Sequence, residues 1–314
     1  MISPQETTTA IPTPVALSHI SVPSRDLEAS KAFYVDALGG DLVLDTPEIG
    51  RVQFGEFGVE FGRQDGGATP RGAEYPHYAF TVDAGEFVAV KQRIEAFGVH
   101  THDPWTRAGK SYALMYFRDP SGNQFELFCP DARNAFPLRL GSRAGGVYAV
   151  DFPSLSYDRL RPPTTAVPAA RPAGYNHMTL PVRDLQEGKR FWTEVLGGWV
   201  SLEHSAHITV VVGGAEVGIS PESGGWTAPD AEYPHYTFRV QPEDLLPLKD
   251  RLAAYGVPTS DVWSRDGADA RFYFRDPSGN LWELLCDAGY AGPLAGAAYR
   301  PDVAALNYDA WRLK

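Results

Sequence analysis

The sequence predicts an α+β fold of tandem βαβββ units, four per chain, which form two curled mixed sheets with helices outside. Two observations support this prediction. The chain of 314 residues repeats itself once, so both halves are expected to share one fold. Within each half, short β-branched and aromatic stretches alternate with stretches of helical periodicity, and this alternation occurs twice.

The internal repeat is visible in several long segments. Residues 18–44 resemble residues 176–202, and AEYPHYAFTV (73–82) returns as AEYPHYTFRV (231–240). Further along, YFRDPSGNQFELFC returns as YFRDPSGNLWELLC, and LSYDRL is echoed by LNYDAW. The segment that follows the last strand of each half is therefore part of the repeat.

The two copies are separated by RPPTTAVPAARPAG, whose prolines and small residues do not form a regular backbone ladder. The first residues are polar and lack a basic start followed by an apolar stretch, which is typical of a disordered leader and not of a signal peptide. The predicted segments are a leader (1–16), a first domain with a C-terminal extension (17–160), a linker (161–174) and a second domain with its own extension (175–314).

The elements of the first half follow from local signals. Asp26 is suited to cap a helix, Gly39-Gly40 to end it, and Asp-Pro-Ser-Gly to form a turn between two strands. In chain order we expect a strand at His19–Val22, a helix that carries Leu27 to Leu38, strands at Leu42–Leu44, Val52–Phe57, Val59–Phe61 and His77–Val82, a helix at Phe87–Phe97, and strands at Ala113–Phe117 and Gln124–Phe128. Two such units give a concave face suited to a small ligand.

Composition excludes several classes of function. The formal net charge of −11 and the absence of any basic run argue against nucleic acid as a partner. No stretch reaches the roughly 18 apolar residues that a membrane span needs. Two cysteines, Cys129 and Cys286, do not make a disulfide framework, so a reducing cytoplasm is the expected location. Self-association is left open.

A set of two histidines and one glutamate recurs at matching positions in both halves. Two neutral imidazoles and one carboxylate can hold a divalent first-row metal ion and leave positions open for substrate, oxygen or water. A single strand histidine is usually a packed or surface residue, but matched recurrence favours metal binding. The candidate ligands are His19, His77 and Glu126 in the first half, and His177, His235 and Glu283 in the second.

These motifs together resemble the vicinal-oxygen-chelate superfamily, which includes glyoxalases, extradiol ring-cleaving dioxygenases, epimerases and fosfomycin- or bleomycin-resistance proteins. The resemblance rests on a first-strand histidine before a helix that ends in LGG, on YPHY, and on YFRDPSGNxxE, and it covers nearly the whole chain. It implies a metal-dependent protein that binds a small molecule.

One interval favours the dioxygenases within this superfamily. Tyr116 precedes Glu126 by ten residues, and Tyr273 stands ten before Glu283. The resemblance to extradiol enzymes implies that each tyrosine donates a hydrogen bond to the bound substrate or oxygen. We therefore expect an extradiol-type dioxygenase that cleaves a small phenolic or catecholic substrate with dioxygen. Fe(II) is the favoured metal, with Mn(II), Zn(II) or Ni(II) as alternatives.

The alternatives are a glyoxalase-like isomerase or lyase and a drug-binding resistance protein. Glyoxalases use a fourth ligand on the strand before the second histidine, where the first half has Glu60. The second half has Gly218 at that position, so three ligands are expected there. We interpret Glu60 as a solvated strand residue.

A Trp-x-Arg motif precedes each tyrosine strand, where extradiol enzymes usually carry an additional, non-ligand histidine that acts as acid and base in the oxygen chemistry. Each arginine is predicted to clamp a carboxylate or phenolate of the substrate, with the tryptophan beside it. The predicted substrate-binding residues are Trp105, Arg107, Trp263 and Arg265. His100 and His102 stand near this position in the first half only.

The sequence leaves open how the four units pair. Each site can take all its ligands from one half, or the first strands can be exchanged, which joins His19 to His235 and His177 to His77. Monomeric duplicated glyoxalases and hydroquinone-cleaving enzymes show the exchanged arrangement. We expect ligands from one half, because the long linker and tail let each half close on itself.

Overall fold

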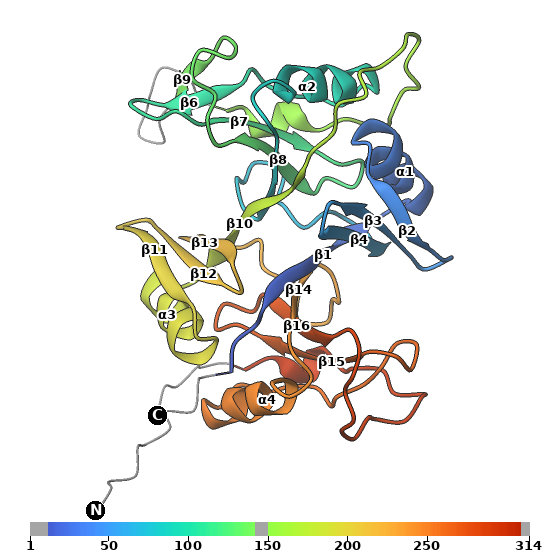
Figure 1. The fold of residues 1–314 in the computed structure, drawn as a ribbon, viewed down its shortest axis with the longest axis vertical. Helices are drawn as coiled ribbons and strands as arrows, with labels where there is room; N and C mark the ends of the chain where they lie inside the picture. Colours follow the sequence, from blue (N-terminus) through green and yellow to red (C-terminus); the bar gives the residue numbers. More distant parts are fainter. Residues whose placement is uncertain (1–11, 142–149, 309–314) are drawn as a thin grey trace, which may run out of the picture.

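The computed structural model describes residues 12–141 and 150–308, which form two curled sheets (Figure 1). The seven-stranded sheet contains, in order across it, β15 (Ala270–Arg275), β16 (Leu281–Cys286), β14 (His235–Arg239), β1 (Ala16–Ser24), β4 (Phe57–Arg63), β3 (Ile49–Phe54) and β2 (Asp41–Asp45). The nine-stranded sheet contains β11 (Trp199–His204), β12 (His207–Val212), β13 (Ala215–Pro221), β10 (Gly174–Val182), β5 (His77–Thr81), β8 (Gln124–Cys129), β7 (Ala113–Arg118), β6 (Trp105–Arg107) and β9 (Arg139–Gly141). Both sheets mix parallel and antiparallel pairs, which confirms the predicted fold class.

The helices lie around the periphery of the strands in Figure 1. They are α1 (Leu27–Ala32) and α3 (Leu185–Arg190), which continue into the π-helical turns η1 (Phe33–Ala37) and η3 (Phe191–Val195), the longer α2 (Phe87–Ala96) and α4 (Leu245–Ala254), and the short 3-10 turns η2 (Phe152–Leu155) and η4 (Ala304–Leu306). Asp26 caps α1 as predicted, because its carboxylate accepts from the backbone N–H of Ala29 at 3.1 Å. None of the helices in the described ranges is long and apolar enough to cross a membrane.

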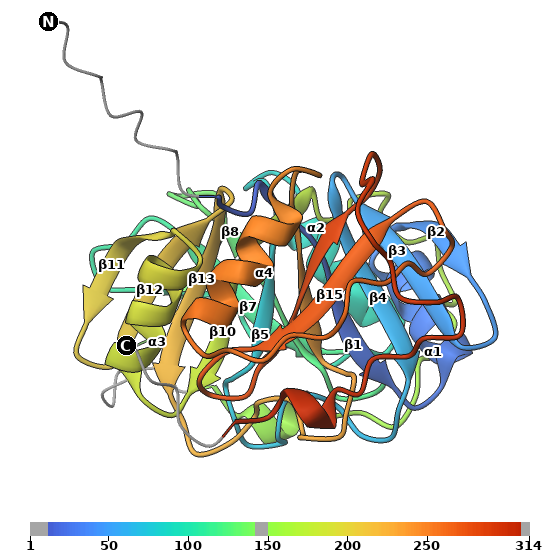
Figure 2. The same ribbon diagram turned by 90° about the horizontal axis from the view of Figure 1, so that it is seen from below.

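The two sheets join the halves of the chain crosswise. Strand β1 of the first half pairs antiparallel with β14 of the second, and β10 pairs in the same way with β5. In Figure 2, β15 and β4, which come from opposite halves, lie in the same sheet. Our expectation that each half closes on itself is therefore wrong.

The physical reason is that the competing partner strands are almost the same. Strands β5 and β14 read HYAFT and HYTFR, so the side-chain pattern of β1 does not distinguish between them. The choice is made by the packing of the complete molecule. At its centre the equivalent residues Tyr78 and Tyr236 lie together, both buried, with hydroxyl oxygens 3.2 Å apart. One hydrophobic core accordingly contains residues of both halves.

The units also differ from the prediction in detail. The expected strand at Val52–Phe57 is divided, because Gly55, at a φ of +60°, turns the chain between β3 and β4. The second unit of each half has only two full strands after its helix. In the first half the third strand is the three-residue β6, and in the second half Trp263 makes only an isolated bridge to Arg271.

The extensions repeat in space as well as in sequence. Leu155 packs in a cluster with Trp105 and Tyr116, and Leu306 packs with Trp263 and Tyr273 at the equivalent place. Each extension thus packs against the strand that carries the tyrosine, β7 in the first half and β15 in the second. Residues 1–11 of the predicted leader, and residues 142–149 and 309–314 of the extensions, lie outside the described residues.

Candidate metal sites

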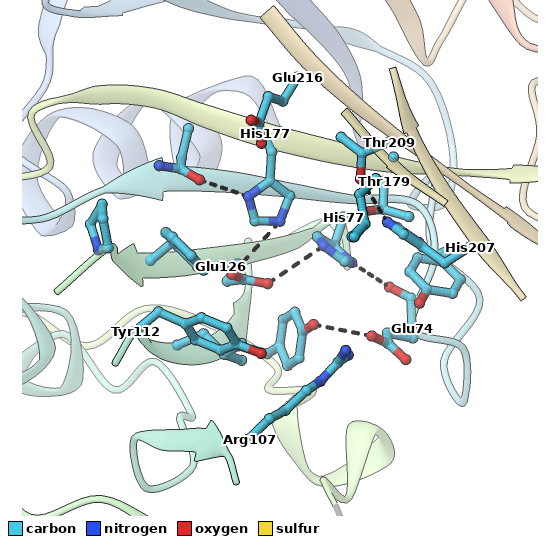
Figure 3. A pocket seen from close by; sticks show the side chains of 18 of the residues that line it. Glu74, His77, Arg107, Tyr112, Glu126, His177, Thr179, His207, Thr209 and Glu216 are labelled. Carbon is cyan, nitrogen blue, oxygen red and sulfur yellow. Dashed lines mark hydrogen bonds and ion pairs between the residues drawn. The ribbon is translucent and has the colours of Figure 1, made fainter. Parts of the chain in front are cut away.

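Crossed pairing brings His77, Glu126 and His177 together, a group that we call the open site. Their ligand atoms all lie within 4.8 Å of one another. His77 Nε2 is 3.5 Å from Glu126 Oε2, and His177 Nε2 is 3.8 Å from Glu126 Oε1 (Figure 3). Two strands of the first half therefore supply two ligands, and β10 of the second half supplies the third.

The unused ring nitrogens fix both imidazoles of the open site. His77 Nδ1 donates to the carbonyl of Glu74 at 3.2 Å, and His177 Nδ1 donates to the side-chain oxygen of Asn176 at 2.8 Å. The Nε2 lone pairs are thereby turned toward Glu126. Burial lowers the pKa of each of these two histidines to about 3, so both rings are neutral.

The open site satisfies the requirements of a divalent metal ion. Nε2 of His77 and Oε1 of Glu126 are buried and have no hydrogen-bond partner among the described residues. Buried polar atoms without partners are rare, and a shared cation is what two neutral imidazoles and a carboxylate can hold together. Burial raises the pKa of Glu126 well above its usual value in the ion-free protein, which a bound cation would reverse.

A pocket of about 570 Å³ opens onto these three residues. Tyr112 and Arg107 lie across Glu126 from the two histidines in Figure 3. The pocket lining is partly apolar, with Leu114, Phe128 and Leu202, and partly polar, with Glu74, Glu216 and His207. It is therefore able to enclose a small, partly aromatic molecule beside the metal ligands.

Tyr116 lies in this pocket, directly opposite Glu126 in the register of β7 and β8. Its hydroxyl donates to Glu74 Oε1 at 3.2 Å, and its ring is 5.2 Å from that of His77. Burial, followed by the charges of Glu126 and Glu74, raises the pKa of Tyr116 well above its usual value. The phenol is accordingly a protonated donor.

The opposite wall holds residues that the sequence reasoning missed. His207 on β12 lies in the pocket, where Nδ1 contacts Ser220 Oγ at 2.9 Å and Nε2 contacts Thr209 Oγ1 at 3.1 Å. Its neighbour Gly218 has no room for a side chain, because a Cβ there would lie 2.7 Å from Thr179 Oγ1 and 2.8 Å from the His207 ring. Sequence reasoning missed His207 because the crossed pairing places it near His77 of the other half, and nothing in the sequence of its own half indicates this neighbour.

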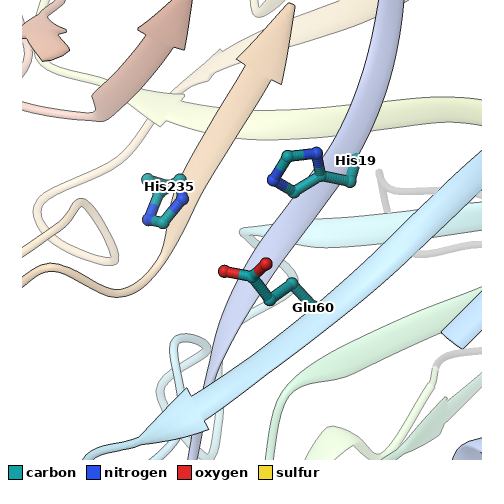
Figure 4. A group of neighbouring side chains, drawn as sticks. All are labelled: His19, Glu60 and His235. Carbon is teal, nitrogen blue, oxygen red and sulfur yellow. The ribbon is translucent and has the colours of Figure 1, made fainter. Parts of the chain in front are cut away.

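A second group forms between β1, β4 and β14. His19, Glu60 and His235 have ligand atoms within 4.8 Å of one another and point toward a common centre (Figure 4). With the nearby Glu283 we call this group the arginine site. Burial lowers the pKa of His19 well below its usual value, so its ring is also neutral.

Glu60 is fully buried, and its interpretation as a solvated residue is wrong. Its carboxylate accepts from Nη2 of Arg51 at 2.6 Å and from Nη1 of Arg265 at 2.9 Å. Burial alone would raise the pKa of Glu60, but Arg265, His19 and Arg51 hold it well below its usual value. The carboxylate survives in the core because two guanidinium groups neutralise it.

Glu283 is engaged in the same manner. Both its oxygens accept from Nη1 of Arg271, at 3.2 and 3.3 Å, and Nη2 of the same guanidinium donates to Asp269. His19 Nε2 contacts Nη2 of Arg51 at 3.2 Å and the Thr237 hydroxyl at 3.1 Å. Glu283 and His19 are thus already in contact with other groups, whereas Nε2 of His235 is buried without a hydrogen-bond partner among the described residues.

We expect Glu60→Gln to lower the free energy of unfolding by about 2–3 kcal/mol. Loss of one partner from a buried ion pair costs roughly 3–5 kcal/mol, and Arg51 and Arg265, 22% and 27% exposed, can regain some hydration. Urea denaturation should show this loss at pH 7. The difference should shrink only as the pH falls below about 4.5, towards the lowered pKa of Glu60, because the ionised form carries the stabilisation. The exposed Glu56→Gln, on the same hairpin, is the control and should change stability by less than about 0.5 kcal/mol.

The predicted substrate-binding residues have different surroundings. Arg107 lines the pocket, whereas Arg265 is held by Glu60. Trp105 and Trp263 are buried in clusters with the two tyrosines and do not line this pocket, and their contact with substrate stays a prediction.

His100 and His102 are also outside the pocket lining. His102 Nε2 accepts from the backbone N–H of Tyr116 at 2.9 Å, and His100 Nδ1 donates to the carbonyl of Ser154 at 3.1 Å. His102 therefore contacts the tyrosine strand directly, and His100 contacts the extension.

The fold and the open site define a duplicated α+β protein with a candidate metal-binding centre. The model of the Glyoxalase/Bleomycin resistance protein/Dioxygenase superfamily matches residues 16–127 and 174–284, and the chain belongs to this superfamily. The proposed resemblance to the vicinal-oxygen-chelate proteins is thereby confirmed.

Among curated proteins, the glutathione transferase FosA of Serratia marcescens is 36% identical over 112 residues, which are 35% of this chain and 77% of that enzyme. The metallothiol transferase FosB of Staphylococcus epidermidis is 28% identical over 115 residues, 36% of this chain and 80% of that protein. These relatives thus correspond to about one half of the duplicated chain.

Two solved structures share the fold over nearly the full length. A presumed dioxygenase from Bacillus subtilis subsp. subtilis str. 168 has a TM-score of 0.61 and 17% identity and covers 89% of this chain and 88% of its own. Glyoxalase I from Zea mays has a TM-score of 0.56 and 15% identity, with 87% and 92% covered. The fold is therefore shared with these solved proteins over nearly the whole chain.

Proposed function

We propose that this protein is a metal-dependent dioxygenase of the extradiol type, which cleaves a small phenolic or catecholic substrate in the open site. The observation that carries the proposal is a two-histidine, one-carboxylate ligand set without a fourth protein ligand. Such a set leaves coordination positions for two substrate oxygen atoms and for dioxygen. A bound Fe(II), or Mn(II) as the alternative, would supply the electron relay between substrate and dioxygen.

The three-ligand set is enforced by packing. Gly218 stands where the arginine site has Glu60, and the surrounding Thr179 and His207 leave no space for a longer side chain. A glyoxalase-like reaction with a fourth ligand is disfavoured for this reason. The open positions therefore face the pocket and its contents.

The charge of the pocket favours a neutral aromatic substrate. Its lining carries three carboxylates, those of Glu74, Glu126 and Glu216, and one guanidinium, that of Arg107. With a divalent cation added, these formal charges balance. A phenol therefore enters without a large desolvation penalty, whereas a doubly charged substrate finds little compensation.

The residues of the pocket supply proton transfer and positioning. Tyr116 donates its hydroxyl hydrogen to a substrate or dioxygen oxygen, which the raised pKa of the phenol permits. His207, on the opposite wall, accepts the proton that a substrate hydroxyl loses on binding. Arg107 orients an anionic oxygen at the outer end of the pocket. Both oxygen atoms enter the product, so ring cleavage needs no external reductant.

We expect the protein, loaded with Fe(II) under nitrogen, to consume oxygen with at least one member of a panel of catechols, hydroquinones and carboxylated phenols. An oxygen electrode measures uptake, and the absorbance of a ring-cleaved product should rise in proportion. His77→Ala, loaded in the same way, is the control and should show only background uptake.

Thiol transfer is the second candidate, because FosA is 36% identical over one half of the chain. A parallel assay supplies glutathione with a small epoxide and measures thiol consumption. Absence of oxygen uptake across the aromatic panel, together with metal-dependent loss of thiol, would refute the dioxygenase and support the transferase.

A further inference from the structure

We propose that only the open site takes up a metal ion, and that in the arginine site guanidinium groups replace the ion and tie the two halves together. This inference rests on the metal dependence in the proposed function but not on the oxygen chemistry. It contradicts the equivalence that the sequence repeat implies, since both sites contain two histidines and a glutamate at matching positions.

The first argument is the state of the potential ligand atoms. In the arginine site, Glu60 is bound by Arg51 and Arg265, and Glu283 is bound by Arg271. In the open site, no guanidinium of the described residues forms an ion pair with Glu126, and the side chains that face its oxygens are the two neutral imidazoles. In the arginine site, a cation must displace bonded arginines from the carboxylates. In the open site, it adds the missing partner to an existing ligand set.

The second argument is that the substitutions between the sites occur in matched pairs. Arg51 lies directly opposite Glu60 across β3 and β4, and the equivalent pair across β12 and β13 is Thr209 and Gly218. The buried carboxylate is thus present together with its guanidinium partner, and both are missing from the open site. Because an unpaired buried charge is strongly unfavourable, each member of the pair requires the other.

A further arginine follows the same pattern. The strand ARFYFR, β15, carries Arg271 where ALMYFR, β7, carries Leu114. Arg271 is 4% exposed and reaches the fully buried Glu283, while Leu114 lines the pocket of the open site. One substitution therefore neutralises a potential ligand in the arginine site and leaves an apolar pocket wall in the open site.

These ion pairs also connect the halves. The bonds from Arg265 to Glu60 span 205 residues of chain and join the segment before β15 to β4. The charge network thus holds together strands that the crossed topology brings from opposite halves. A structural role explains why a site whose carboxylates are all bound by arginines keeps so many buried charges.

The test measures bound Mn(II) in the full-length chain by equilibrium dialysis and elemental analysis, with the protein EPR signal as a second readout. We expect one ion per chain in the wild type, none in His77→Ala and one in His235→Ala. Two ions in the wild type, or an ion that is lost with His235 and kept without His77, would overturn the inference. No ion in the wild type would overturn the proposed function and this inference together.

A gain-of-binding variant tests the role of the arginines directly. Arg51→Thr combined with Arg271→Leu gives these two positions of the arginine site the residues that the open site has, leaves Glu60 paired with Arg265, and releases Glu283 as a ligand beside His19 and His235. We expect the stoichiometry to rise from one ion to two, with circular dichroism as the check of folding. A folded double variant that still binds one ion would refute the replacement of metal by arginine. If the double variant does not fold, His77→Ala and His235→Ala decide which site holds the ion.

Discussion

Replacing Glu126 by glutamine is expected to abolish metal binding by the protein and, with it, every metal-dependent activity. The substitution keeps the shape of the side chain but removes the only carboxylate of the open-site ligand set, between two imidazoles that burial keeps neutral. Loss of an outer-sphere partner alone typically weakens metal affinity about 10–100-fold, so we expect a first-sphere loss to exceed 100-fold. Isothermal titration with Mn(II) measures the change.

The duplicated chain offers a matched control in Glu283→Gln. This residue occupies the equivalent place on β16, but it is bound to Arg271 and lies in the arginine site. We expect Glu283→Gln to keep the affinity of the wild type and to lose only stability. Equal losses of affinity in the two variants would show that the sites are not distinct.

Tyr116→Phe is expected to retain the metal and lose turnover by about 10²–10³-fold. The hydroxyl is 3.2 Å from Glu74 and lies on the same face as Glu126, so it is the donor placed beside the bound substrate. A single donor that stabilises developing charge in the transition state typically contributes a factor of this size. Steady-state oxygen uptake should show the loss in kcat, with KM changed much less.

Tyr273→Phe is the corresponding control. Tyr273 is fully buried, donates to Glu232 at 3.1 Å, and lies opposite Glu283 in the arginine site. Its substitution should leave kcat within about twofold of the wild type, because the proposed reaction takes place in the other site. A large loss in Tyr273→Phe with none in Tyr116→Phe would exchange the roles of the two sites.

The class of fold could be predicted because it depends on local patterns that the repeat presents twice. The capped helix that starts after Asp26, the turns at glycine, and the strand that carries YPHY are all set by neighbouring residues. The pairing of the units could not be predicted, because β5 and β14 present nearly the same side chains to β1 and β10. The strand pairs β1 with β14 and β10 with β5 are known only from the folded molecule, in which Tyr78 and Tyr236 of the two halves meet.

The candidate site was predictable to a similar extent. The types of ligand and their positions on strands follow from the sequence, and the structure brings His77, His177 and Glu126 together. The surroundings do not follow, because they come from the other half. Glu60 is bound by Arg265 of the other half, and His207 shares its pocket with His77 of the other half.

The crossed strands have a consequence for the divergence of the two copies. Two separate chains, each equal to one half, could pair in the same manner, and the symmetry of such a homodimer would force both sites to be identical. A substitution that introduces a buried arginine would then disable both centres at once. The linker between residues 161 and 174 removes this constraint, because each half can mutate independently. Covalent fusion thus permits the two centres to diverge from each other.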